Sequence, residues 1–355
     1  MTFPTLDHER VVTAIGRRSG LPITAAVHST ALGTALGGCR VWRYDAWQDG
    51  FADALRLSSA MTLKCAVAGL PTGGGKSVIA VPRSVDLTPE LRHRALLDLG
   101  DLVESLGGVY RTAPDVGTGS SDMLAIRERT QNVIGLPASH GGVGEPAAPT
   151  AIGVYSALRA TAARVGVELA GMRVTVSGLG QVGARLATRL AADGAQLLCS
   201  DLDPSRRRVA EDLGAVWVEP GEALFAPADL VVPAGVGGIL TADSIARLNC
   251  RAVVGPANNQ LAEEGLDASL AERGIVWAPD FVANAGGALA AILTEVQHLD
   301  AVDVNRQLEQ IGSTMETIFD IAESASTTPY RAALQLAESR LRAAERTDLA
   351  EALGS

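Results

Sequence analysis

The chain has 355 residues, of which 47% are apolar and 20% charged, a composition typical of a globular protein long enough for two domains. Its formal net charge of −10 argues against a nucleic-acid partner or an anionic membrane surface. No run approaches the roughly 18 apolar residues that span a membrane, and the first residues lack a basic and then apolar leader, so we expect a cytoplasmic protein.

Aromatic residues make up only 4% of the chain while glycine and alanine abound, which favours a layered α/β protein. The first part reads as a mixed α/β domain, which we expect over residues 1–140. Its expected elements are a short amphipathic helix over 9–18, strands over 23–29 and 38–44, a helix from 45 to about 68, a strand over 77–82, a helix over 88–106, a strand over 109–114 and a helix from 120 or 121. Lys64 then lies in the last turns of the long helix.

A stretch rich in glycine, proline and alanine over 135–149 predicts a hinge between two domains. Helices and strands then alternate regularly, which predicts a doubly wound parallel sheet over residues 141–320. The expected elements are helices over 150–165, 181–192 and 204–213, and strands over 173–177, 196–200, 215–218, 230–232 and 252–254. The tail reads as helix, and we expect residues 321–355 to pack back on the first domain.

A glycine-rich turn joins the strand over 173–177 to the helix that follows it. Gly178, Gly180 and Gly183 form GxGxxG, and Asp201 ends the next strand 23 residues after the first glycine. Such glycines let backbone N–H groups approach a pyrophosphate at a helix N-terminus, and the carboxylate accepts hydrogen bonds from the ribose. The turn therefore predicts a Rossmann domain that binds NAD, since Asp201 would repel a 2′-phosphate. The arginines at 206–208 fit a solvated helix face better than a phosphate clamp.

Lysine usage is more informative than the total charge. Of the 30 basic residues, 28 are Arg and only Lys64 and Lys76 are Lys. Arg keeps its charge, whereas Lys loses its proton when it is desolvated or placed near another cation. The two lysines are therefore candidates for chemistry rather than survivors on a solvated surface.

Lys76 follows a glycine run, GLPTGGGKSV, which invites a phosphate-loop interpretation. That motif needs a Gly at the place of Leu70, so an ATPase or kinase is not expected. The glycines would instead let the backbone approach a small ligand beside Lys76. The four cysteines and five histidines show neither paired nor zinc-ligand spacing, so no disulfide and no metal site is predicted.

Six blocks carry a family resemblance in chain order: ALGGCRVWRY, AMTLKCAVAGLPTGGGKSVIAVP, TAPDVGTGSSDM, VSGLGQVGARLA, GPANNQLA and PDFVANAGG. Together they resemble the amino acid dehydrogenases of the leucine, phenylalanine and valine type, relatives of glutamate dehydrogenase. The resemblance implies reversible oxidative deamination of an L-amino acid with NAD to a 2-oxo acid, ammonia and NADH. It also implies a homo-oligomer, a substrate-binding first domain, a cofactor-binding second domain, and catalysis as the two close.

The resemblance assigns roles to individual residues. Lys64 binds the substrate carboxylate, Lys76 activates water at the imine carbon, and Asp115 moves protons to and from the amino group. Two ammonium groups that share a partly dry pocket would lower each other's pKa, which fits a basic Lys76; alone, Asp115 would read as a turn residue. The remaining implied contacts are Asn258 with the substrate carboxylate, Thr150 and Asn284 with the nicotinamide, and Gln181, Val182 and Ala234 with the cofactor. The family often has Cys where Ala234 stands and Ser where Ala147 stands.

The expected substrate is apolar. Glutamate-specific relatives hold the substrate side chain with a Lys at the position of Leu36, and burying an unpaired carboxylate there would cost several kcal/mol. The expected pocket residues are Leu36, Gly37, Met61, Ala288 and Ala291. Alanine at the last two positions enlarges the pocket relative to leucine-type relatives, so phenylalanine or another aromatic amino acid is favoured. A branched-chain substrate, a nonstandard amino or imino acid, and a noncatalytic NAD sensor remain the alternatives.

Overall fold

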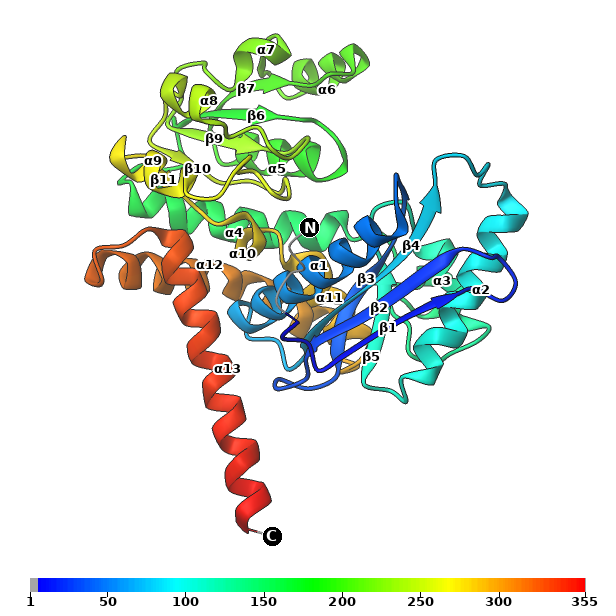
Figure 1. Ribbon diagram of the computed structural model, residues 1–355. Helices are drawn as coiled ribbons and strands as arrows, with labels where there is room; N and C mark the ends of the chain where they lie inside the picture. Colours follow the sequence, from blue (N-terminus) through cyan, green and yellow to red (C-terminus); the bar gives the residue numbers. More distant parts are fainter. Residues whose placement is uncertain (1–5, 355) are drawn as a thin grey trace. The chain divides into compact units, whose positions relative to one another are not determined.

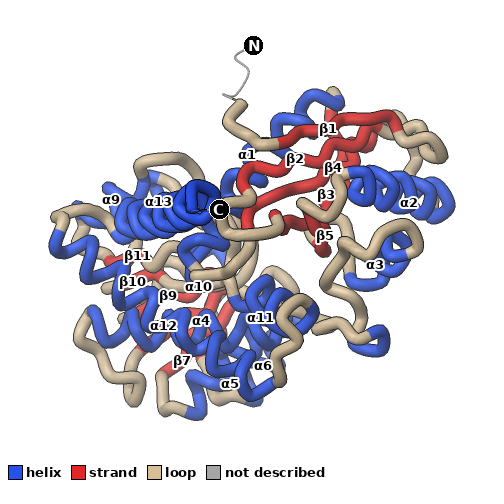
Figure 2. Tube along the Cα trace, turned by 90° about the horizontal axis from the view of Figure 1, so that it is seen from below, coloured by secondary structure: helices blue, strands red, loops and turns tan. Residues whose placement is uncertain are grey.

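The computed structural model describes residues 6–354, and the side chains of residues 6–346. The chain divides into two compact units. The first contains Met1–Glu145, Ala291–His298 and Ala337–Ser355, and the second contains Pro146–Ala290 and Leu299–Leu336. The strands of each unit gather into one sheet with helices around it (Figure 2). The expected α/β fold with two sheets is confirmed.

The first unit is built on a mixed sheet in the order β1-β2-β4-β3-β5. Its strands are β1 (Arg10–Ile15), β2 (Pro22–Ser29), β3 (Ala35–Tyr44), β4 (Gly73–Pro82) and β5 (Tyr110–Pro114). The pairs β1–β2 and β2–β4 are antiparallel, whereas β3 runs parallel to both β4 and β5. This order places β3 between β4, which contains Lys76, and β5, which Asp115 follows directly.

Helices cover both faces of this sheet (Figure 1). They are α1 (Trp47–Val67), α2 (Pro89–Ser105) and α3 (Ser120–Arg127), and a short 3-10 turn, η1, spans Ala138–His140. Ala54 and Leu55 of α1 pack against Ala26 and Val78, while leucines of α2 and Met123 of α3 pack on the opposite face. Thr88 caps α2, because its Oγ1 accepts a hydrogen bond from the Leu91 N–H at 3.2 Å.

The expected helix over 9–18 is wrong, since these residues form the edge strand β1. Val11 packs toward α1 and Val12 packs toward the other face of the sheet. Neighbouring apolar residues on the two faces of a strand mimic the spacing of an amphipathic helix. The β-branched Val-Val-Thr run is the signal that favours the strand.

The glycine run lies inside β4 and is not a loop. A Cβ on Gly73 would lie 1.9 Å from the Ser29 carbonyl oxygen, one on Gly74 2.1 Å from the Thr62 nitrogen, and one on Gly75 2.6 Å from the Tyr110 ring. These glycines therefore allow β4 to approach β2, α1 and the side chain from β5. Close packing between these elements of the first unit therefore explains the three glycines.

The second unit contains a six-stranded parallel sheet in the order β11-β10-β9-β6-β7-β8. Its strands are β6 (Arg173–Ser177), β7 (Gln196–Ser200), β8 (Val216–Trp217), β9 (Leu230–Pro233), β10 (Ala252–Val253) and β11 (Val276–Trp277). The strand order reverses at β6, whose neighbours are β7 and β9. In a doubly wound sheet, ligands bind at the carboxyl ends of strands at such a reversal.

The remaining helices are α4 (Ala147–Arg164), α5 (Gln181–Ala192), η2 (Pro204–Arg206), α6 (Arg207–Asp212), α7 (Pro220–Ala223), α8 (Ala242–Arg247), α9 (Leu266–Glu272), α10 (Asp280–Ala283), α11 (Gly286–Glu295), α12 (Ala301–Ser324) and α13 (Pro329–Gly354). The division between units falls within α11 and within α13. Arg340 on the later part of α13 donates to the carbonyls of Ala66 and Val67 at the end of α1, at 3.0 and 2.6 Å. The expected contact of the C-terminal helix with the first unit is confirmed for the part of α13 that starts at Ala337.

Among the described residues, no helix is both long and apolar enough to cross a membrane. The same part of the chain contains no group of three His, Cys, Asp or Glu side chains arranged to hold a metal ion.

Candidate active site and cofactor loop

Lys76 and Asp115 form a largely buried ion pair in the first unit. Lys76 Nζ lies 2.8 Å from Asp115 Oδ2, and the two side chains are 5% and 23% exposed. Cys39 of β3 pairs with Ser77 on one side and with Pro114 on the other, so Lys76 and Asp115 flank the same point of β3. A Cβ on Gly38 would lie 2.6 Å from Asp115 Cβ, so the glycine leaves room for this carboxylate.

Burial and charge shift both pKa values in this pair. Burial lowers the pKa of Lys76, although the nearby Asp115 carboxylate opposes that shift. Burial also acts to raise the pKa of Asp115, but the cations Lys76 and Arg40 outweigh it and lower that pKa. The pair thus combines an ionised carboxylate with an amine that gives up its proton more readily than a lysine in water.

Arg40 is a member of this site that the sequence analysis missed. Its Nε lies 3.1 Å from Asp115 Oδ2, and its NH1 lies 2.8 Å from Asp53 Oδ2 on α1. Tyr44 donates its hydroxyl to the same Asp53 oxygen at 2.8 Å, and Arg56 contacts the other oxygen at 2.6 Å. Charges therefore alternate from Lys76 through Asp115, Arg40 and Asp53 to Arg56.

The other predicted substrate residues of this unit lie on β3 and α1. Leu36 is buried in β3, and a Cβ on Gly37 would lie 1.6 Å from the Gly75 carbonyl oxygen, so Gly37 serves the contact between strands. Met61 and Lys64 lie three residues apart on one side of α1, and both are partly exposed. They occupy the helix that covers the Lys76 face of the sheet, because Thr62 packs directly on Gly74.

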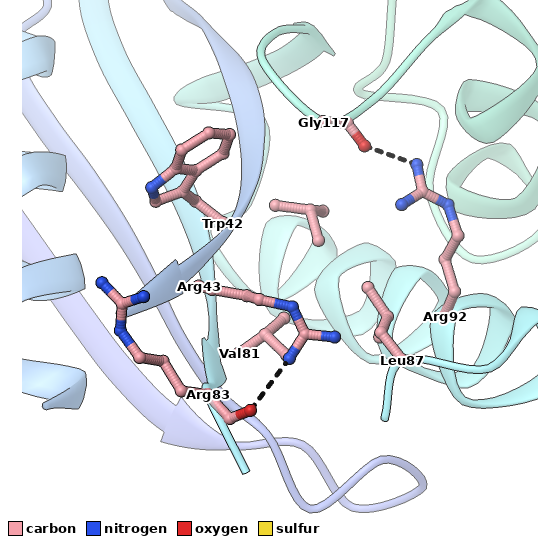
Figure 3. A pocket seen from close by; sticks show the side chains of 8 residues that line it. Trp42, Arg43, Val81, Arg83, Leu87, Arg92 and Gly117 are labelled. Carbon is pink, nitrogen blue, oxygen red and sulfur yellow. Dashed lines mark hydrogen bonds between the residues drawn. The ribbon is translucent and has the colours of Figure 1, made fainter. Parts of the chain in front are cut away.

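A cavity of about 390 Å³ lies elsewhere on the same unit, and Figure 3 shows its lining. None of the predicted site residues lines it. Arg43 donates to the Arg83 carbonyl and Arg92 to the Gly117 carbonyl (Figure 3). Arg43 also donates to the Val85 carbonyl, and Arg92 to Asp122. Backbone carbonyls and Asp122 already engage these guanidinium groups, and the lining of the cavity contains neither Lys76 nor Asp115.

The predicted cofactor turn in the second unit is built by close backbone contacts. Gly178 has φ +108°, and a Cβ there would lie 2.7 Å from the carbonyl carbon of Ala234, in the loop after β9. A Cβ on Gly183 would lie 2.0 Å from the Gly178 carbonyl oxygen and 3.0 Å from Ala234 Cβ. Gly180, by contrast, would meet nothing within 4 Å. It is the N-cap of α5, so no side chain caps the first N–H groups of that helix.

Asp201 lies at the carboxyl end of β7, beside this turn. Its carboxylate accepts hydrogen bonds from the backbone N–H groups of Leu179 at 2.6 Å and Asp203 at 2.8 Å. Gln181 and Val182, the first residues of α5, are exposed and partly exposed. The turn, its carboxylate and the loop at Ala234 thus surround the start of one helix, with free space at Gly180.

The two predicted asparagines of the second unit are in contact. Asn284 Nδ2 donates to Asn258 Oδ1 at 2.8 Å, and Asn284 is buried whereas Asn258 is exposed. Thr150 lies on α4, where its Oγ1 is 2.8 Å from the position of a Cβ on Gly287. Ala288 and Ala291 lie three residues apart on α11 and therefore share one side of that helix.

Two descriptions of one protein family match this chain: "Glu/Leu/Phe/Val dehydrogenase, dimerisation domain" over residues 11–132, and "Glutamate/Leucine/Phenylalanine/Valine dehydrogenase" over 200–348. The leucine dehydrogenase of Thermoactinomyces intermedius is 37% identical over 344 residues, which cover 96% of this chain and 93% of that protein. The chain belongs to the Glu/Leu/Phe/Val dehydrogenase family. It is an L-amino acid dehydrogenase, an oxidoreductase that acts on the CH–NH₂ group.

Other relatives of this amino acid dehydrogenase are named for different substrates. The phenylalanine dehydrogenase of Bacillus thermotolerans is 36% identical over 348 residues, covering 95% of this chain and 89% of that protein. The crystal structure of L-tryptophan dehydrogenase from Nostoc punctiforme superposes with a TM-score of 0.84 at 34% identity, covering 96% of this chain and 97% of that chain. Relatives of the leucine and phenylalanine types are equally similar, so a special closeness to the phenylalanine type is not supported. Residues 153–237 also match the NAD-binding domain of D-isomer specific 2-hydroxyacid dehydrogenases.

Proposed function

We propose that this dehydrogenase catalyses the NAD-dependent, reversible oxidative deamination of an apolar L-amino acid, with an aromatic side chain favoured. The products are the 2-oxo acid, ammonia and NADH. The observation that carries the proposal is the buried pair of Lys76 and Asp115, with Nζ and Oδ2 2.8 Å apart. A lysine with a lowered pKa beside an ionised carboxylate provides a base and a proton shuttle at one carbon atom.

The proposed steps use the side chains of the first unit. Lys64 holds the substrate carboxylate as a point charge. Asp115 takes a proton from the substrate ammonium group. NAD, when bound, would supply the hydride acceptor for the substrate Cα, so that the substrate becomes an iminium ion. Neutral Lys76 takes a proton from water as the water oxygen bonds to the imine carbon. Asp115 then returns its proton to the amino nitrogen, the C–N bond breaks, and ammonia leaves as the hydroxyl proton passes to the freed Asp115 carboxylate. Protonated Lys76 donates a hydrogen bond to the new carbonyl oxygen.

The residues of the second unit fit NAD. Free space at Gly180 and uncapped N–H groups at the start of α5 suit a pyrophosphate. The carboxylate of Asp201, already hydrogen-bonded to the turn, would accept from the ribose hydroxyls and repel a 2′-phosphate. Gln181, Val182 and Ala234 would contact the dinucleotide, and Thr150 and Asn284 the nicotinamide amide, so NAD is the proposed cofactor rather than NADP.

The pocket residues support an apolar substrate. Leu36 is buried, and the two lysines of the chain already have assigned roles, so a substrate side-chain carboxylate would find no cation among the assigned residues. Met61, Gly37 and Asn258 complete the proposed contacts. Ala288 and Ala291 leave more room on α11 than larger aliphatic residues would, which favours an aromatic side chain. The likeness to L-tryptophan dehydrogenase supports the same choice, while leucine or valine is the alternative.

A substrate panel tests the proposal. The protein is incubated with NAD and each apolar L-amino acid at alkaline pH, and NADH absorbance is followed; the reverse reaction is run with 2-oxo acids, ammonia and NADH. We expect kcat/KM for phenylalanine or tryptophan to exceed that for leucine by about tenfold, since pocket fit is worth on the order of 1–3 kcal/mol. A preference for leucine or valine would establish the alternative, and activity only with glutamate would refute the assigned pocket.

We also propose that the enzyme is a homo-oligomer assembled through the first unit. The family description for residues 11–132 names a dimerisation domain. Light scattering coupled to size-exclusion chromatography tests this, and a mass equal to the 36.6 kDa chain would contradict it.

A further inference from the structure

Arg40 links the proposed catalytic pair to the surface of α1. Its guanidinium bridges Asp115, 3.1 Å from Nε, and Asp53, 2.8 Å from NH1, and its side chain is only 18% exposed. We propose that Arg40 is a positioning residue for the Lys76–Asp115 pair: it locks the Asp115 carboxylate and keeps a fixed positive charge beside Lys76, so that Lys76 works as a neutral base. This inference rests on the proposed roles of Lys76 and Asp115.

The geometry explains how Arg40 holds the carboxylate. Lys76 Nζ and Arg40 Nε both contact the same Asp115 oxygen, Oδ2. A carboxylate oxygen held between two cationic donors has little rotational freedom. Oδ1 is then the oxygen that this cation pair does not engage, and under the proposal it is the oxygen that exchanges a proton with the substrate.

Arg40 is itself held from the opposite side. Asp53 contacts it through Oδ2, and that oxygen also accepts the Tyr44 hydroxyl, while Oδ1 contacts Arg56. Asp53 is as buried as Arg40, at 18% exposed. Because Asp53 neutralises part of the Arg40 charge, the guanidinium is stable in this partly buried place. Arg40 therefore cannot swing away from Asp115 without breaking its contact with Asp53.

Electrostatics gives Arg40 a second effect. Its charge helps to lower the pKa of Asp115, where it opposes the effect of burial, and it lowers the pKa of Lys76, where it adds to the effect of burial. Arg keeps its charge over the working pH range, so this field does not titrate. The buried Cys39 thiol, whose pKa burial raises to about 12, stays neutral over that range. The charged or titratable groups that act most on the pKa of Lys76 are Asp115, Arg40 and Cys39. The elements packed against its strand also carry Asp53, Lys64 and Cys65 on α1, His28 on β2, Tyr44 on β3 and Tyr110 on β5.

The test compares Arg40→Gln and Arg40→Lys with a matched control, Arg56→Gln. Arg56 contacts the same Asp53 but has no recorded contact with Asp115. Deamination is measured as a pH profile of kcat, and folding is checked by thermal unfolding. The titration of Lys76 is followed separately by NMR of lysine-selectively ¹⁵N/¹³C-labelled protein, which is simple to assign because the chain has only two lysines. Lys64→Arg identifies the Lys76 signal.

We expect Arg40→Gln to move the acidic limb of the kcat profile and the Lys76 titration to higher pH. Removal of the neighbouring cation raises the pKa of Lys76, so kcat on the acidic limb should fall about tenfold more than kcat on the plateau at higher pH. Arg40→Lys restores the position of the limb, and Arg56→Gln leaves it unchanged. An equal loss of activity at every pH, with the Lys76 titration unmoved, would overturn the inference because it describes a purely structural role.

If Arg40→Gln does not fold, Asp53→Asn is used in its place. It keeps the guanidinium but removes an anion, so the limb and the Lys76 titration should move to lower pH; no movement overturns the inference. If the unmodified protein turns over no amino acid, the proposed function fails. The Lys76 titration in the Arg40 variants still decides whether Arg40 controls this lysine.

Discussion

Two glycines of the cofactor turn should respond in opposite ways to a single added methyl group. In Gly183→Ala the new Cβ lies 2.0 Å from the Gly178 carbonyl oxygen, so backbone must shift. In Gly180→Ala the new Cβ meets no protein atom within 4 Å. The first change therefore perturbs the fold, and the second perturbs only what occupies the free space.

The expected magnitudes follow from these contacts. Forcing a methyl group into packed backbone costs about 3 kcal/mol, which lowers the melting temperature of a unit of this size by about 8 °C. For Gly180→Ala, weaker N-capping costs about 0.5 kcal/mol and the reduced entropy of the unfolded chain returns about as much. Its stability should stay within about 0.5 kcal/mol, while NAD affinity falls about 30-fold because a methyl group costs the pyrophosphate about 2 kcal/mol.

Urea unfolding and calorimetric titration with NAD measure the two quantities separately. We expect stability to separate the variants, with Gly183→Ala destabilised and Gly180→Ala as stable as the wild type. We also expect Gly180→Ala to bind NAD weakly despite its normal stability. Wild-type NAD affinity in Gly180→Ala would show that the pyrophosphate does not pass this residue.

Three further changes test the first unit and the pocket. Lys76→Gln should lower kcat about 10³-fold and leave the NAD dissociation constant within about twofold, measured by steady-state kinetics and calorimetry. Asp98, 3% exposed, accepts hydrogen bonds from Arg18 and Ser19, so Asp98→Asn should lower the free energy of unfolding by about 2 kcal/mol in urea without changing kcat. The pKa of Asp98 is lowered because these donors outweigh burial, so its contribution is present above its ordinary pKa and is lost as pH falls through the lower folded value. The stability difference between Asp98→Asn and wild type should therefore disappear in acid, and a difference constant down to pH 2 would contradict the assignment. Ala291→Val should lower kcat/KM for phenylalanine relative to leucine about fivefold in the substrate panel.

Local patterns were enough to predict most of the second unit. The bounds of β6, α5 and β7 agree with the expected ranges, because alternating apolar residues and the glycine turn mark each end locally. The strand β11 was missed, since Val276 and Trp277 form a two-residue strand that has no period of its own. The helix α4 begins at Ala147, three residues before the predicted start, because the hinge composition concealed its first turn.

Packing between distant segments explains what the sequence could not reveal in the first unit. From the sequence alone, the glycine run is interpreted as a loop beside a ligand. In the structure, Thr62 and Tyr110 occupy the space next to these glycines. In the sequence, Arg40 is one residue of a predicted strand. An arginine in the strand GGCRV needs a buried carboxylate partner, and this requirement is a signal that could have identified Arg40 as a site residue. Its partners, Asp53 and Asp115, lie 13 and 75 residues away, so only the fold identifies them.

Lysine and arginine meet at one carboxylate oxygen in this enzyme, and their chemical difference explains why both are needed there. Lys76 is the more buried, and desolvation lowers its pKa, whereas the acidic partners of Arg40 outweigh burial and raise its pKa. Exchanging the two residues would place a permanent cation where the proposed mechanism requires a base, and a titratable amine where it requires a fixed charge. In a chain that uses arginine for 28 of its 30 basic residues, the proposed mechanism explains why a lysine stands at the buried position of this pair, since loss of a proton there would serve the reaction.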